Sequence, residues 1–94
     1  MTQTFTEFDP AEFLETPESI AEFLNEALAV ADAAYIAKAL GVVARAKGMS
    51  SVADQTGLSR EQLYKTFSEQ GNPTLKTLLA LTQVLNLNLS VTPR

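Results

Sequence analysis

Residues 50–67 read SSVADQTGLSREQLYKTF, and this stretch determines the architecture of the chain because it encodes two short helices separated by a glycine. Ser50 or Ser51 can cap the first helix, since a serine oxygen accepts hydrogen bonds from the free amides of a first helical turn. Gly57 ends this helix after about two turns. Because glycine readily adopts the left-handed conformation, the stretch predicts a short helix followed by a tight turn.

A second helix is predicted directly after the turn. Ser59 is its expected N-cap, and Gln62 three residues later completes the S-x-x-Q capping box that marks helix starts. Leu63 and Phe67 lie one helical turn apart and supply the buried face. Two helices joined by a tight glycine turn are typical of a helix-turn-helix, whose second helix lies in the major groove of DNA. Two ordinary core helices with an incidental glycine turn are the alternative interpretation.

Regular structure is predicted on both sides of this stretch. Capping residues and apolar spacing predict helices over about 17–30 and 33–47. A last helix starts at Asn72-Pro73 and ends near Asn86, and the alternation of apolar and polar residues over 87–92 predicts a terminal strand. We therefore expect an all-α domain of five helices with a short C-terminal β-strand.

The N-terminal residues have a weaker pattern. Residues 4–8 alternate enough for a short strand or an extended arm, and Asp9-Pro10 opens a single helical turn that continues to Glu15. We expect an acidic N-terminal arm over 1–16 and a single domain over 17–94, with the helix-turn-helix at about 50–69.

Composition limits the classes of function. The 94 residues suffice for one domain, and 46% hydrophobic and 19% charged residues are typical of a globular protein. Without cysteine or histidine, the chain has no disulfide, thiolate site or histidine-based metal or acid–base site. No glycine-rich phosphate loop is present, so we expect neither an enzyme nor a cofactor. Lacking a signal sequence or an apolar run of about 20 residues, the chain is expected to be cytoplasmic and free of membrane segments.

Charge is divided unevenly along the chain. Residues 1–37 carry eight acidic and no basic residues, whereas residues 38–94 carry seven basic and three acidic residues, a net charge of +4. The overall charge of −4 opposes nucleic-acid binding, which depends on phosphate neutralisation by basic residues. This division of charge favours two different partners for the two halves of the chain. The alternative interpretation is that the acidic residues merely cover solvated helix faces.

Several runs carry a resemblance to known families: Phe8-Asp9, Ala11-Glu12-Phe13-Leu14, residues 20–28, Gly57-Leu58-Ser59-Arg60-Glu61-Gln62-Leu63-Tyr64, Gly71-Asn72-Pro73 and residues 87–91. Residues 50–65, with Gly71-Asn72-Pro73-Thr74 and the apolar helix after them, resemble the Xre/Cro-type helix-turn-helix of phage-repressor-like proteins. Nearly the whole chain, most strongly residues 48–75, resembles the probable addiction-module antidote family, small antitoxins paired with RelE/ParE-like toxins. The resemblance implies a lambda-repressor-like domain that represses its own transcription as a homodimer on operator DNA and captures a toxin.

Residues of the second short helix are the candidates for reading bases. Its exposed face, opposite the buried side chains, is expected to present Arg60, Gln62, Lys65 and Thr66. Arginine can bond guanine bidentately and glutamine can pair with adenine, which suits direct readout. Gln62 has a competing role in the capping box, so base reading and capping are both open for it.

Other residues are candidates for contacts to phosphates or sugars, which set position rather than sequence. The candidates are Lys47, Ser50, Ser51, Ser59, Tyr64 and Lys76, with Arg45 as a further possibility. The serines precede helix amides that suit an anion. The hydroxyl of Tyr64 can bond a phosphate, although a half-buried core role suits an amphipathic aromatic equally.

Partners follow from the same reasoning. One copy of the motif covers few base pairs, so we expect a homodimer with half-sites about 34 Å apart, joined through the C-terminal strand or the outer face of the last helix. The acidic first 37 residues suit a basic toxin. Two alternative functions remain open. One is a stand-alone phage-type regulator, and the other is an interaction module that no longer binds DNA.

Overall fold

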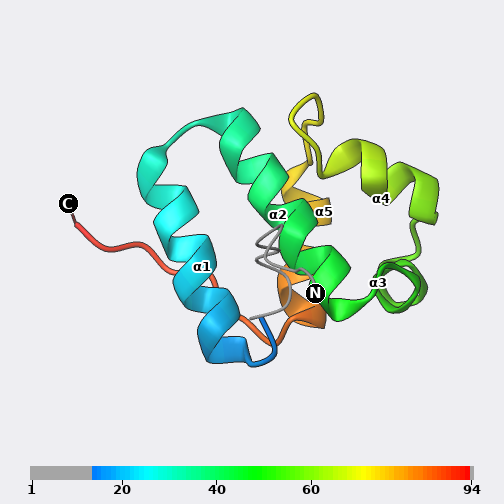
Figure 1. Cartoon of the computed structure of the whole chain (residues 1–94), viewed down its shortest axis with the longest axis horizontal. Coiled ribbons are helices and arrows are strands. Elements are labelled where there is room, and N and C mark those ends of the chain that lie inside the picture. Colours follow the sequence, from blue (N-terminus) through cyan, green and yellow to red (C-terminus); the bar gives the residue numbers. More distant parts are fainter. Residues whose placement is uncertain (1–13, 94) are drawn as a thin grey trace, which may run out of the picture.

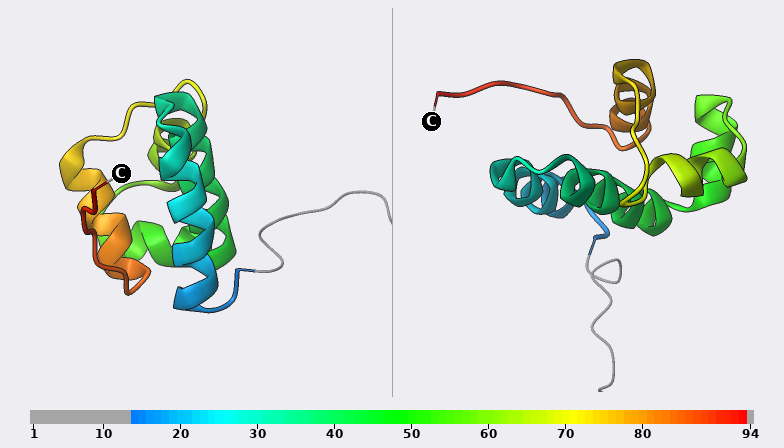
Figure 2. Two further views of the ribbon diagram at one scale, coloured as in Figure 1. Left: turned by 90° about the vertical axis from the view of Figure 1, so that its left-hand side faces the viewer. Right: turned by 90° about the horizontal axis from the view of Figure 1, so that it is seen from above.

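The computed structural model describes residues 14–93, and within them the chain forms five α-helices and no β-strand. The helices are α1 (Pro17–Val30), α2 (Ala33–Lys47), α3 (Met49–Thr56), α4 (Arg60–Thr66) and α5 (Leu75–Val84). As Figure 1 shows, α1 and α2 run antiparallel to each other, and α3 and α4 lie at the end of the molecule remote from α1. α5 lies on one side of the α1–α2 pair (Figure 2). The expected all-α class with five helices is confirmed.

The predicted C-terminal strand is wrong for the described part of the chain. Residues 87–93 have no regular secondary structure and extend from α5 toward the end of the molecule where α1 lies (Figure 1). Leu87 still packs against the core, and its amide donates to the Thr82 carbonyl at 2.9 Å. Beyond it, Leu89 and Val91 are 48% and 97% exposed. The alternating pattern is real, but a strand needs a neighbouring strand to pair with its backbone, and residues 14–93 supply none.

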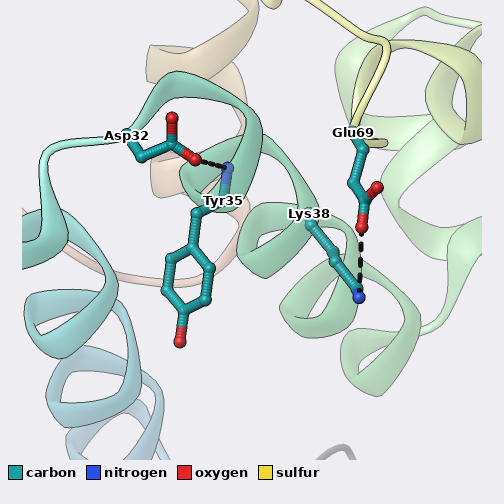
Figure 3. Close-up of polar contacts among 4 residues, drawn as sticks. All are labelled: Asp32, Tyr35, Lys38 and Glu69. Carbon is teal, nitrogen blue, oxygen red and sulfur yellow. Dashed lines mark hydrogen bonds and ion pairs between the residues drawn. The ribbon is translucent and has the colours of Figure 1, made fainter.

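Local capping explains the first two helices, whose bounds are those predicted. Thr16 and Ser19 form a reciprocal capping box, in which the Ser19 amide donates to Thr16 Oγ1 at 3.1 Å. Ala31 ends α1 in the left-handed conformation with φ of 60°. Asp32 then caps α2 by accepting a hydrogen bond from the Tyr35 amide at 3.1 Å (Figure 3). Such caps satisfy amides that have no partner within the helix.

The start of α3 differs from the prediction. Its N-cap is Gly48, at φ 111°, which also ends α2, so one residue separates the two helices. Ser50 and Ser51 therefore lie inside the first turn instead of capping it. The hydroxyl oxygen of Ser51 accepts a hydrogen bond from Gln55 Nε2 at 3.0 Å. A glycine with positive φ turns the chain so sharply that α3 begins before either serine.

The last helix also begins later and ends earlier than expected. Thr74 caps α5 by accepting a hydrogen bond from the Thr77 amide at 3.1 Å, two residues after the predicted start at Asn72. α5 ends at Val84, and Asn86 turns the chain away with φ of 59°.

The core lies where the inner faces of the helices meet. Its largest fully buried side chains are Val43, Val52, Leu63 and Leu81. Gly41 marks a close approach of α2 to the end of α4, because a Cβ built there would overlap the Phe67 carbonyl oxygen. Leu14, although it falls in the predicted N-terminal arm, is 7% exposed and belongs to the core cluster. The inner face of α2 thus holds α4 in place.

Two predictions concern residues at the N-terminal end. The predicted strand or arm over 4–8 lies outside the described residues, as does most of the predicted turn before Glu15. Leu14 and Glu15 themselves are not helical. Among the described residues, no helix is long and apolar enough to cross a membrane.

Candidate nucleic-acid interface

α3 and α4 meet through a connection of three residues, 57–59. Figure 1 shows α3 nearly end-on while α4 lies across the view, so the two helix axes are steeply inclined. Gly57 makes the turn in the left-handed conformation, with φ of 79°, and its amide donates to the Ala53 carbonyl at 2.9 Å. Thr56 stabilises the end of α3 beside the turn, because its hydroxyl donates to the Val52 carbonyl at 2.7 Å. Leu58, which follows the turn, is partly buried and packs against the core.

α4 has one buried and one exposed face. Leu63 and Phe67 are 0% and 4% exposed and anchor the helix in the core. Successive residues are rotated by about 100°, so the side opposite these anchors is centred on Lys65 and Glu61. Both are exposed, and they lie one turn apart.

The remaining predicted readers lie outside the centre of this exposed face. Gln62 is exposed on one flank, and Thr66 is only half-exposed. Arg60, three residues before Leu63, lies on the side of the anchors, and it is exposed at the first position of α4. Glu61 was not among the residues predicted from the sequence. Helical periodicity would have identified it, and a carboxylate can accept a hydrogen bond from cytosine N4.

The capping box of α4 is confirmed, and it occupies part of Gln62. The Gln62 amide donates to Ser59 Oγ at 3.0 Å, and the Ser59 amide donates to Gln62 Oε1 at 3.1 Å. The side-chain oxygen of Gln62 is therefore engaged, while its Nε2 has no partner among the described hydrogen bonds. In this arrangement the Nε2 of Gln62 can still donate to an acceptor, whereas pairing with adenine through both side-chain atoms requires Oε1 to leave the cap.

Three of the predicted phosphate contacts, Lys47, Ser50 and Ser51, lie around the start of α3. Lys47 is in the last turn of α2, and Ser50 is exposed in the first turn of α3. The cap residue Gly48 offers no side-chain acceptor to the first amides of α3, which leaves them facing solvent or a ligand. Ser51 is half-buried and bonded within its helix, so it is the weaker candidate.

Three other predicted residues lie farther from that point. Arg45 and Tyr64 line one shallow groove between α2 and α4, and Tyr64 is 46% exposed. Lys76 is exposed on α5, which packs against α3. The predicted residues of α4 thus share one short helix, whereas Lys76 belongs to a different helix, α5.

Charge on α3 and α4 nearly cancels. Arg60 and Lys65 stand against Asp54 and Glu61, and no ion pair joins any of these four in the described structure. The one ion pair found among the described residues is Lys38 Nζ to Glu69 Oε2 at 3.3 Å (Figure 3). Residues 14–93 also contain no cluster of three or more carboxylates that could hold a metal ion.

Comparison with known proteins identifies the family. The family model described as probable addiction module antidote protein matches residues 4–93. The chain is 44% identical over 91 residues to an uncharacterized protein of Haemophilus influenzae, an alignment that covers 97% of this chain and 94% of the relative. No solved structure matches the chain significantly. The chain belongs to the family of probable addiction module antidote proteins.

Proposed function

We propose that the protein is the antitoxin of a type II toxin–antitoxin module, which represses its own operator through a helix-turn-helix and neutralises a RelE/ParE-like toxin. Family membership supports the antitoxin role. The observation that carries the DNA-binding part is α4, anchored by Leu63 and Phe67 and presenting Lys65 and Arg60 to solvent beyond a glycine turn. The proposal includes no enzymatic step and no cofactor.

Base reading is assigned to α4 and phosphate binding to the start of α3. In this arrangement α4 enters the major groove, where Arg60 and Lys65 reach base edges. Lys47 and the first amides of α3 contact the phosphate backbone and fix the register. Specificity and overall affinity then depend on different residues, so they can be tested separately.

The first experiment measures binding to the protein's own promoter region by fluorescence anisotropy, with scrambled competitor DNA and at two salt concentrations. We expect tight binding that survives the competitor and weakens as salt rises, because phosphate contacts release counterions. Equal affinity for promoter and scrambled DNA would contradict an operator-specific repressor. Absence of binding both alone and with the toxin would contradict the DNA-binding part as a whole.

Two alanine substitutions separate the roles of the residues. Arg60→Ala is expected to lower affinity for the operator and to leave affinity for random DNA nearly unchanged. Lys47→Ala is expected to weaken both and to reduce the salt slope by about one phosphate contact. Equal losses on both DNAs for Arg60→Ala would remove it from the base readers.

We also infer that the repressor binds as a homodimer. A single α4 of seven residues covers few base pairs, so two-fold pairing on half-sites about 34 Å apart supplies the missing specificity. Leu75 and Leu79 support this inference, because they lie one turn apart on α5 and are 69% and 44% exposed. Sedimentation of the chain without residues 87–94 tests whether the C-terminal segment takes part, since an unchanged dimer would assign the contact to α5.

The near-neutral charge of α3 and α4 favours a second candidate function, an interaction module with this helix arrangement but without DNA affinity. Because Asp54 and Glu61 offset Arg60 and Lys65, counterion release contributes little from these helices. The same anisotropy experiment discriminates the two functions.

A further inference from the structure

The face of the molecule formed by α1 and α2 contains an apolar groove. Its volume is about 250 Å³, and it is open to solvent along one side. Its walls are the side chains of Phe23, Ala27, Ala39 and Val42, and its rim is formed by Glu26, Tyr35 and Lys38. Figure 3 shows the side chains of Tyr35 and Lys38 projecting from the same side of α2. Tyr35 is 51% exposed, so an aromatic ring stands at the rim without being covered.

The charge around this groove is acidic. Glu26 lines the groove and also belongs to the outer face of α1, where Glu18 and Glu22 lie one turn apart along the helix. On the opposite rim, the ammonium group of Lys38 is engaged with Glu69 at 3.3 Å. This pair is exposed and contributes little to stability, but it places a carboxylate beside the one basic group of the rim. The groove therefore presents uncompensated negative charge from α1.

We propose that this α1–α2 groove is the docking site for the toxin, and that it takes a basic amphipathic segment whose apolar side chain fills the groove while a neighbouring Lys or Arg pairs with Glu26. The proposal rests on the antitoxin function proposed above. It specifies which surface makes the contact and what chemistry the partner presents.

Charge complementarity selects this occupant over others. Nucleic acid and anionic lipid would be repelled by the acidic face of α1, and a second copy of this chain would bring a second acidic α1 to it. Small-molecule pockets usually exceed about 300 Å³ and enclose most of the ligand, which an open groove of about 250 Å³ does not. A protein segment with one apolar side chain between basic residues is complementary to this groove, because the apolar side chain contacts the walls and the basic residues pair with the acidic rim.

The position of the groove is compatible with DNA binding by α4. α1 and α4 lie at opposite ends of the molecule in both Figure 1 and the right-hand view of Figure 2. A partner seated on α1 and the first half of α2 leaves the exposed face of α4 free. The toxin and the operator would thus use separate surfaces of one chain.

The test uses the purified product of the reading frame adjacent to this gene as the probe, and titration calorimetry of the full chain at low and moderate salt. Glu26→Lys is expected to raise the dissociation constant about tenfold at low salt and less at moderate salt, because an attraction becomes a repulsion. Its matched control is Asp54→Lys on α3, which changes the net charge equally but lies outside the groove. The control is expected to stay within about twofold of wild type.

A second pair of variants tests the apolar part. Tyr35→Ala is expected to raise the dissociation constant about tenfold at both salt concentrations, since it removes an aromatic contact. Val91→Ala, at a 97% exposed position on the C-terminal segment, is its control and should bind as wild type does. Circular dichroism is expected to show wild-type helix content for all four variants, because each replaced side chain is exposed.

Amide NMR mapping of the wild-type chain keeps the proposal falsifiable if a variant fails to fold. Addition of the probe should shift resonances of α1 and the first half of α2 and leave those of α4 in place. Two outcomes would contradict the groove as the docking site while leaving the antitoxin function intact. In the first, Glu26→Lys and Tyr35→Ala bind the probe as tightly as wild type does. In the second, the probe shifts only resonances of other helices. No binding by the wild-type chain would overturn both.

Discussion

The substitution Gly41→Ala tests two physical effects that change the free energy of unfolding in opposite directions. Gly41 lies within α2, and its backbone touches the end of α4 at Phe67. A Cβ at position 41 would overlap the Phe67 carbonyl oxygen and would lie 3.4 Å from the carbonyl carbon. Helix propensity alone favours alanine over glycine inside a helix by about 1 kcal/mol. Packing opposes the substitution, because a backbone carbonyl cannot rotate out of the way.

The structure indicates that packing is the larger effect. Inserting a methyl group into a packed interior costs about 1–3 kcal/mol, and contact with backbone places Gly41→Ala near the upper end of that range. Subtracting the propensity gain leaves a net loss of about 2 kcal/mol in the free energy of unfolding. For a domain of this size, each kcal/mol lowers the melting temperature by about 4–8 °C, so we expect a fall of roughly 8–16 °C.

Urea unfolding followed by circular dichroism measures this free energy directly. Ala29→Gly, at an exposed position of α1, is the control, because it measures the propensity difference where nothing packs against the residue. Because Ala29 lies in the last turn of α1, the substitution should cost less than the roughly 1 kcal/mol of a helix interior. If Gly41→Ala were more stable than wild type by a similar amount, the close approach of α2 and α4 would be refuted. Operator affinity is also expected to fall, because relief of the overlap displaces α4.

Three further predictions follow from the turn and the helix surfaces. Ser59→Ala should cost about 1 kcal/mol in urea unfolding by removing the cap of α4, and Ser59→Asp should restore most of it. Gly57→Ala should cost about 1–2 kcal/mol in the same assay, because φ of 79° strains any L side chain, whereas equal stability would argue against this turn. Leu79→Glu should shift the protein toward monomer in sedimentation velocity, with Leu89→Glu as the comparison that separates α5 from the C-terminal segment.

Local signals accounted for the helices whose ends are set by neighbouring side chains. Thr16 and Asp32 cap α1 and α2 at the predicted residues, and Ser59 caps α4 with Gln62 as expected. In each case the donor and acceptor are three residues apart, so the hydrogen bond depends on local sequence more than on the packing of distant helices. The predicted start of α3 was wrong, because Gly48 rather than a serine is the N-cap. Which residue takes that position depends on how α3 packs against α2.

The candidate interface was predictable in part. Lys65 is exposed, as the periodicity of Leu63 and Phe67 requires, and Glu61, which the sequence prediction did not include, shares its face. Arg60 is exposed because it begins α4, although its spacing to Leu63 places it on the side of the anchors. Thr66 is more covered than expected. Base reading by these residues stays a prediction, as does the homodimer.

Sequence alone was sufficient for the five helices, the glycine turn, the absence of cysteine and histidine chemistry, and the family resemblance, because all of these depend on residue type and short-range spacing. Other features depend on the tertiary structure. It left residues 87–93 without a strand partner, buried Leu14 in the core, and brought Phe23 of α1 beside Val42 of α2 to form a groove with Glu26 at its rim. Contacts between residues so distant in the chain depend on how whole helices pack, and no local pattern encodes that packing.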